Sequence, residues 1–153
     1  MEPVISAADI REAGEILKLQ ARCYQSEAAI YSDYSIPPLT QTIESMLADF
    51  ATQRILVARV GTEIVGSVRA HATWTGCHIG RLIVHPRLRR RGLGSQLMHC
   101  IEEDFAGTQR YELFTGHLSE GNFRLYNRLG YREFKRESPS PNLVFVYMEK
   151  YRL

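Results

Sequence analysis

The sequence has almost no excess of either charge. Its 19 lysines and arginines nearly balance 17 aspartates and glutamates, which leaves a formal net charge of +2 at pH 7. Proteins that bind nucleic acid or an anionic membrane through their overall charge carry a larger surplus, so we expect neither partner. Apolar runs stay well short of the roughly 20 residues that a membrane-spanning helix needs. The first residues also lack the layout of a signal peptide, so we expect a cytoplasmic protein.

Cysteine is scarce too. Cys23, Cys77 and Cys100 are an odd number and show no C-x-x-C spacing, so neither a disulfide framework nor a metal site is expected. The chain has 153 residues, of which 44% are hydrophobic, and this is enough for one core of ordinary size. We therefore expect residues 1–153 to form a single domain.

Hydrophobic periodicity predicts an α/β (α+β) fold. Strand-like runs occur at residues 4–5, 54–60, 64–71, 77–85, 111–115, 131–136 and 143–151, with Pro139 and Pro141 in the last connection. Helical spacing follows a capping box at Ser6-x-x-Asp9 and lasts to near Tyr24. It recurs from Pro37-Pro38 to Phe50, at 92–107 and at 120–129. Strands and helices thus alternate irregularly, as in a mixed sheet.

Residues 82–95, LIVHPRLRRRGLGS, join a buried strand to a helix through glycines and arginines. Gly92 and Gly94 leave the backbone open where a ligand must approach it. The first N–H groups of a helix are unsatisfied donors, and an anion satisfies them. The four arginines within residues 87–91 would add charge-assisted hydrogen bonds to a pyrophosphate. The alternative is a solvated basic turn, and neither a Walker A nor a Rossmann pattern is present.

The same segment resembles the signature of a known family. Val84-His85-Pro86 followed by Arg89-x-x-Gly92-x-Gly94 is similar to the motif Arg/Gln-x-x-Gly-x-Gly/Ala of the GNAT superfamily of N-acetyltransferases. A second element of that superfamily follows at Asn122-x-x-Leu125-Tyr126-x-x-x-Gly130-Tyr131. The resemblance implies a GNAT fold, with a central mixed, mostly antiparallel twisted sheet of about seven strands flanked by about four helices.

The resemblance implies acetyl-CoA as co-substrate and no metal. Backbone groups of three strand residues would pair with the pantetheine arm, one N–H would polarise the acetyl carbonyl, and amides of residues 90–95 would bind the pyrophosphate. Asn122 could replace an asparagine that many relatives carry where this chain has Ser119. The expected cofactor-binding residues are Leu82, Ile83, Val84, Arg89, Arg90, Arg91, Gly92, Leu93, Gly94, Ser95, Asn122 and Tyr126.

Two residues are candidates for catalysis. The resemblance places Tyr126 near the cofactor sulfur, where its hydroxyl would protonate the departing thiolate; the alternative is aromatic packing. His78 lies six residues before Val84, where some relatives carry a catalytic Glu or His near the amine, and an ordinary pKa of about 6.5 suits a general base. Glu112 or Glu27 could act instead, and a lone strand histidine is often structural.

These observations favour an enzyme that moves an acetyl group from acetyl-CoA to a primary amine of a small molecule or peptide by direct attack on the thioester. An acceptor site with carboxylates and aromatic rings would suit a cationic amine, and its expected residues are Tyr24, Glu27, Tyr31, Asp33 and Tyr34; the alternative is an ordinary surface. A non-catalytic acyl-CoA-binding or sensory module is the alternative function. Because relatives often dimerise, a homodimer is a candidate assembly.

Overall fold

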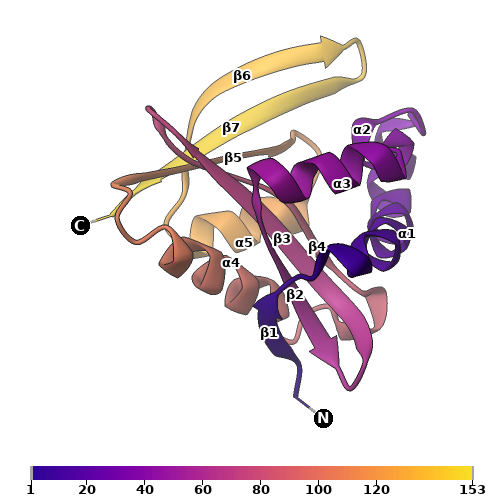
Figure 1. Ribbon diagram of the computed structural model, residues 1–153. Helices are drawn as coiled ribbons and strands as arrows, with labels where there is room; N and C mark the ends of the chain where they lie inside the picture. The colour runs from indigo at the N-terminus through magenta and orange to yellow at the C-terminus, as the bar shows by residue number, and fades with distance from the viewer. Residues whose placement is uncertain (1, 153) are drawn as a thin grey trace.

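The computed structural model describes residues 2–152 (Figure 1). Seven strands in these residues form one sheet in the order β1-β2-β3-β4-β5-β7-β6, and every neighbouring pair is antiparallel except β4 and β5. The strands are β1 (Val4–Ala7), β2 (Arg54–Val60), β3 (Glu63–Thr73), β4 (Gly76–Val84), β5 (Arg110–Gly116), β6 (Arg132–Ser140) and β7 (Leu143–Tyr151). The predicted mixed, mostly antiparallel sheet is confirmed.

Helices cover both faces of this sheet (Figure 1). They are α1 (Ala13–Tyr31), the single turn α2 (Pro37–Thr40), α3 (Ile43–Thr52), α4 (Leu93–Asp104) and α5 (Glu120–Arg128). Strand β2 shows why both faces are buried: Leu56 and Ala58 pack in the core with α4, whereas Val57 packs with α1 and α3. This alternation is the period of two that places successive side chains on opposite faces of a strand.

Four local predictions were wrong. The one helix predicted from Pro37-Pro38 to Phe50 is two helices, because α2 ends at Thr40 and Thr42 caps the start of α3. The capping box is formed by Asp9 and Glu12, and the Glu12 side chain accepts from the Asp9 N–H at 2.8 Å. Ser6 is not part of it, because Ser6 belongs to β1 and pairs with Val57. Helix α1 continues past Tyr24 to Tyr31, since the buried stripe of the helix continues to that residue. Pro139 lies within β6, which is an edge strand where the missing N–H is tolerated.

The sheet opens between β4 and β5. These parallel strands pair only through Cys77↔Tyr111 and His78↔Glu112. Strand β4 then stays paired with β3 as far as Val84, while its other edge has no strand partner among the described residues. The backbone of residues 79–84 therefore faces a gap in the sheet on the β5 side.

A bulge interrupts β4 within this opened half. Arg69 of β3 pairs with Gly80 and Ser67 pairs with Ile83, so three steps along β4 match two along β3. The inserted residue is Arg81, whose φ of 53° is left-handed and costs a non-glycine residue about 1 kcal/mol.

The bulge also changes which β4 side chains face which helix layer. Cys77 and Ile79 pack in the core with α4 before it, and Leu82 and Val84 pack there after it. The one extra residue therefore shifts by one position the alternation of β4 side chains between the two faces of the sheet. As a result, Arg81 lies on the same face of the sheet as α1, instead of on the face covered by α4.

Candidate functional site

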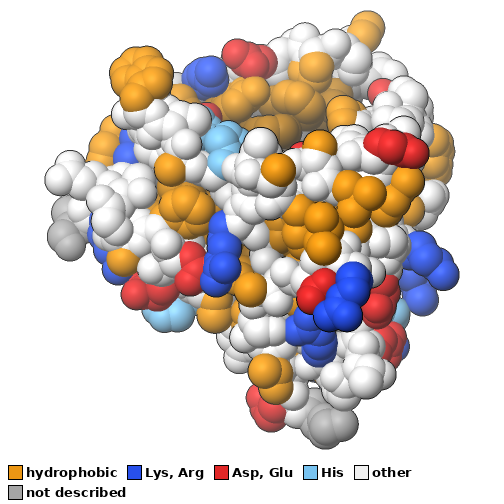
Figure 2. All heavy atoms as spheres, in the orientation of Figure 1, with side chains coloured by type: hydrophobic (Ala, Val, Ile, Leu, Met, Phe, Trp, Pro, Cys, Tyr) orange, Lys and Arg blue, Asp and Glu red, His pale blue; other side chains and the backbone are white. Residues whose placement is uncertain are grey.

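A cavity of about 1340 Å³ lies where β4 and β5 separate. Figure 2 shows a hollow with hydrophobic side chains at its floor, in the region between the β6–β7 hairpin and α3. The cavity brings together both sequence elements that predicted a cofactor site. Of the predicted site residues, those that line it are His78, Leu82, Ile83, Val84, Arg89, Arg90, Gly92, Leu93, Gly94, Ser95, Asn122 and Tyr126, whereas Arg91 does not.

The loop before α4 presents a run of free backbone donors. Within residues 2–152, the N–H groups of residues 90–95 make no hydrogen bond, and the first bond of α4 runs from the Gln96 N–H to the Gly92 carbonyl at 3.0 Å. No side chain caps this helix, because Gly92 occupies the N-cap position with a φ of 82°. Unpaired N–H groups and the positive end of the helix dipole together form a site that an anion fits.

The arginines of this loop have different surroundings. The guanidinium of Arg87 pairs with Glu63 on β3, with Nη1 3.0 Å from Oε2, so this arginine already has an anionic partner. Arg89 lines the cavity and its Nε donates to the Val84 carbonyl at 3.4 Å. Arg90 has a left-handed φ of 64°, which turns the backbone of the loop toward α4.

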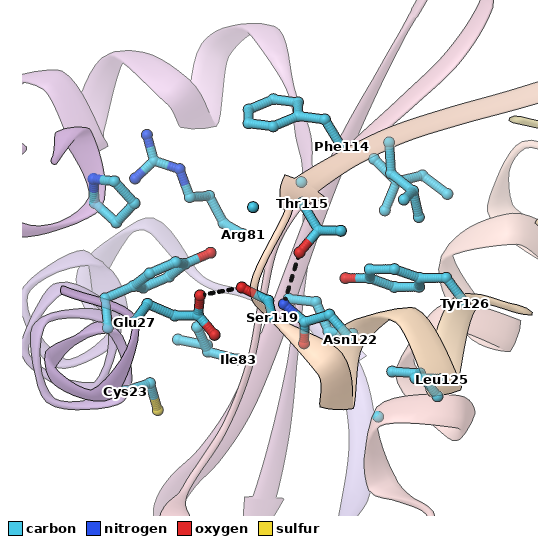
Figure 3. A pocket seen from close by; sticks show the side chains of 18 of the residues that line it. Cys23, Glu27, Arg81, Ile83, Phe114, Thr115, Ser119, Asn122, Leu125 and Tyr126 are labelled. Carbon is cyan, nitrogen blue, oxygen red and sulfur yellow. Dashed lines mark hydrogen bonds between the residues drawn. The ribbon is translucent and has the colours of Figure 1, made fainter. Parts of the chain in front are cut away.

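Tyr126 projects from α5 into the cavity (Figure 3). Its ring meets Tyr131 edge-on at a centroid distance of 6.1 Å, and only 7% of the residue is exposed. Burial raises the pKa of the Tyr126 hydroxyl above its usual range, and Tyr24 and Glu27 raise it further. The hydroxyl therefore keeps its proton at neutral pH and can act as a donor.

A chain of hydrogen bonds crosses the cavity from the β5–α5 connection to α1. The Leu118 N–H donates to the Tyr31 hydroxyl at 2.9 Å, and that hydroxyl lies 2.8 Å from Ser119 Oγ. Ser119 in turn donates to Glu27 Oε2 at 2.6 Å (Figure 3). Because the single Ser119 proton goes to the carboxylate, Tyr31 must be the donor to Ser119.

Asn122 lines the cavity and has a free acceptor in its side chain. Its side-chain Nδ2 donates to Thr115 Oγ1 at 3.0 Å (Figure 3), and its amide oxygen accepts no hydrogen bond from residues 2–152. Ser119, by contrast, is 3% exposed and its hydroxyl is engaged by Tyr31 and Glu27. Of the two, Asn122 has the free acceptor on the cavity wall.

His78 has hydrogen-bond partners at one of its two ring nitrogens. Nε2 lies 2.9 Å from Thr73 Oγ1 and 3.1 Å from Thr75 Oγ1, and Nδ1 lies 3.6 Å from Glu112 Oε2. The ring also stacks on His71, with centroids 5.3 Å apart. Burial lowers the pKa of the imidazole below 6.5, although the Glu112 carboxylate acts in the opposite direction. The imidazole is therefore neutral at pH 7, and its Nε2 already has hydroxyl partners.

Two cavity residues, Arg69 and Arg81, were missed by the sequence reasoning. Arg69 is 3% exposed; its Nη1 lies 2.6 Å from Asp49 Oδ2 and its Nη2 donates to Gln20 Oε1 at 2.7 Å. Arg69 Nε and Arg81 Nη1 are buried without a hydrogen-bond partner among the described residues. A lone arginine inside the apolar run IVGSVRA was the available signal for Arg69, because charged residues are rarely buried without a partner.

The expected acceptor wall is partly wrong. Tyr24, Glu27 and Tyr31 line the cavity, since α1 extends far enough to carry them there. Asp33 and Tyr34 do not line it, because the helix ends at Tyr31 and the chain turns outward. Asp33 instead accepts hydrogen bonds from Ser35, and Tyr34 is 58% exposed.

Comparison with protein families agrees with this geometry. The family described as an acetyltransferase (GNAT) domain matches residues 21–152. This chain belongs to the GNAT acetyltransferase family. Among residues 2–152 of this GNAT protein, no histidines, cysteines or carboxylates cluster as a metal site would require. Nor does any helix in that part of the chain have the length and apolar character to cross a membrane.

Solved structures share the fold. This GNAT protein is similar to the PaiA N-acetyltransferase from Thermoplasma acidophilum in complex with coenzyme A, with a TM-score of 0.83, 16% identity and coverage of 99% of this chain and 100% of that one. It is also similar to YncA from Salmonella typhimurium with acetyl-CoA, with a TM-score of 0.76, 15% identity and coverage of 99% and 94%. These matches confirm the predicted GNAT fold.

A curated relative is considerably longer. The UPF0157 protein YqkA from Bacillus subtilis is 23% identical over 139 residues, which are 91% of this chain. The chain spans 40% of the length of that relative.

Proposed function

We propose that this GNAT protein transfers the acetyl group of acetyl-CoA to a primary amine of a small molecule or peptide, by direct attack of the amine on the thioester. The observation that carries the proposal is the run of unpartnered N–H groups at residues 90–95, which lies at the end of the unpaired edge of β4. Two similar structures hold coenzyme A and acetyl-CoA, which supports the choice of donor.

The residues present fit such a donor. The N–H groups of residues 90–95 would bind its pyrophosphate, and Arg89 and Arg90 line the cavity beside them. The free backbone edge at Leu82, Ile83 and Val84 would hydrogen-bond the pantetheine arm as a neighbouring strand does, and the Asn122 amide oxygen would accept from one of its N–H groups. Acetyl-CoA supplies the activated acyl group when it is bound.

Tyr126 is the proposed proton donor. Its hydroxyl points into the cavity, and burial keeps it protonated. A neutral donor at this place would protonate the thiolate that leaves when the amine displaces it, so that charge does not accumulate in a buried site.

Glu27 is the proposed group that receives the amine. Ser119 holds Oε2 of this carboxylate, and Oε1 accepts no hydrogen bond from residues 2–152. An incoming ammonium would bind there and lose its proton before attack. His78 is the second candidate for this role, although the Thr73 and Thr75 hydroxyls at its Nε2 must be displaced if that nitrogen is to act.

His78 already contacts Thr73 and Glu112, and this favours one alternative function, a non-catalytic acyl-CoA-binding or sensory module. Calorimetry with CoA, followed by release of free thiol from acetyl-CoA with a panel of amines, distinguishes the two. Saturable CoA binding with turnover supports the transferase, and binding without turnover supports the module.

The Tyr126→Phe variant tests the mechanism, with Tyr34→Phe as a matched control because Tyr34 is exposed and outside the cavity. We expect Tyr126→Phe to lower kcat about tenfold to a hundredfold with little change in CoA affinity. Absence of CoA binding in the wild-type protein would refute the proposed function.

A further inference from the structure

We infer that the acceptor amine also carries a carboxylate group, as an amino acid does, and that Arg69 and Arg81 bind this carboxylate. The inference rests on the proposed function of the same cavity and names the class of acceptor that the cavity selects.

The first observation is a pair of unused donors. Arg69 Nε and Arg81 Nη1 are both buried, and neither has a hydrogen-bond partner among residues 2–152. Both arginines line the cavity. Burial of an unpaired N–H of a charged group is costly, so native proteins normally provide it with a partner. Because neither atom is exposed to the cavity, the two side chains would turn toward a bound ligand oxygen, and that contact would remove the cost at each atom.

The second observation is local charge. Asp49 is the only carboxylate of the described residues that pairs with Arg69, and none of them pairs with Arg81. Burial lowers the pKa of Arg69, and the nearby charge of Arg81 lowers it further. This part of the cavity therefore has more positive than negative charge, and an anionic ligand would balance it.

The third observation is the position of Arg81 on the bulge of β4. The extra residue places its side chain on the α1 face of the sheet, where α1 also carries Glu27 into the cavity (Figure 3). A ligand between them would meet a carboxylate on one side and guanidinium groups on the other. This arrangement fits an amine and a carboxylate on the same molecule.

The phosphates of the donor do not explain these arginines. The free N–H groups at residues 90–95 begin beyond the end of β4, whereas Arg81 precedes the segment 82–84 that would hold the pantetheine arm. Arg69 lies on β3, enclosed by Gln20 and Asp49 from α1 and α3. The anion that these two arginines accept therefore belongs to the acceptor.

Matched acceptors test the inference. Initial rates are measured with acetyl-CoA and amino acids of varied side chain, each compared with the amide of the same amino acid, which keeps the amine and lacks the carboxylate. We expect kcat/KM to favour the free amino acid roughly 10- to 100-fold, as a charge-assisted hydrogen bond predicts. Arg81→Met should abolish most of this preference, and Arg81→Lys should restore part of it. Arg132→Met, on exposed β6, is the control and should leave the preference unchanged.

A second measurement does not need turnover. N-acetyl amino acids and their amides are titrated by calorimetry into the protein saturated with CoA, and the N-acetyl amino acids should bind more tightly in the wild type but not in Arg81→Met. Equal rates and equal binding for acid and amide would overturn the inference while leaving the transferase intact. Lack of CoA binding would instead contradict the proposed function, and a preference that Arg81→Met leaves unchanged would overturn the role of Arg81.

Discussion

The hydroxyl of Ser119 donates a 2.6 Å hydrogen bond to the carboxylate of Glu27, which lies 92 residues earlier in the chain. This bond fixes the position of a cavity carboxylate from the opposite wall, and Tyr31 supports it by donating to the same serine. Helix α1 and the start of α5 are thus joined by side chains across the opening in the sheet. A reacting amine would meet a carboxylate that is already oriented.

The position of Glu27 gives a prediction that separates the two candidates for the base. Glu27→Gln preserves the hydrogen bond from Ser119 but removes the negative charge, so kcat should fall about a hundredfold at neutral pH, within the range typical of general bases. His78→Gln should lower kcat less than about fivefold, because the hydroxyls of Thr73 and Thr75 already occupy its Nε2. Steady-state kinetics at saturating acetyl-CoA measures both, and the reverse order of effects would identify His78 as the base.

Gly116 is predicted to be essential for the placement of Tyr31. A Cβ at this position would lie 2.1 Å from the Tyr31 hydroxyl, so Gly116→Ala must displace the ring and break the chain of hydrogen bonds. We expect a loss of about 1–3 kcal/mol in the free energy of unfolding, measured by urea denaturation. Gly14→Ala is the control, because a Cβ there meets nothing within 4 Å and should stabilise helix α1. Equal stability of the two variants would contradict this account.

Substitution of Gly94 is expected to weaken CoA binding while leaving the stability of the fold nearly unchanged. A Cβ at Gly94 would come no closer than 3.4 Å to Leu125, which is ordinary contact, so Gly94→Ala should melt within a few degrees of the wild type. The added methyl group lies beside the free N–H groups, and we expect it to weaken CoA binding about tenfold or more. Calorimetry measures the affinity. Gly107→Ala, with open space around its Cβ, should bind CoA normally.

The stability of the protein should decrease on mild acidification, partly through His78. Burial lowers the pKa of this imidazole in the folded state, so the unfolded chain binds the proton more tightly. Between the folded and unfolded pKa values the free energy of unfolding rises with pH, and the contribution of His78 is complete only above about pH 6.5. His78→Gln should therefore lose less stability than the wild type between about pH 7.5 and 5.5. The exposed His99→Gln variant is the control and should follow the wild type.

Much of the fold follows directly from sequence pattern. Strand β2 has the predicted bounds, and α4 begins after the predicted glycine, because alternating and helical spacing of apolar residues report burial locally. The loop at residues 90–95 was recognisable for the same reason, since its chemistry depends on backbone donors and on glycines that are adjacent in the chain.

The acceptor half of the cavity could not be predicted in this way. Arg69 and Arg81 line the same cavity only because β3 and β4 pair with a shifted register, and a bulge with arginine in a left-handed conformation has no established sequence signal. The contact between Glu27 and Ser119 likewise depends on how α1 packs across the sheet. Contacts of this kind are set by tertiary arrangement, which single-sequence patterns do not encode.

The bulge at Arg81 also has a consequence for protein engineering. It separates Arg81, whose side chain is proposed to bind the acceptor, from residues 82–84, whose backbone is proposed to bind the donor. Under these proposals, the side chains at positions 78 and 81 can be exchanged to change which amine is accepted, while the backbone of residues 82–84 stays intact. Libraries that vary these two positions and leave the length of β4 unchanged should yield new specificities without loss of CoA binding.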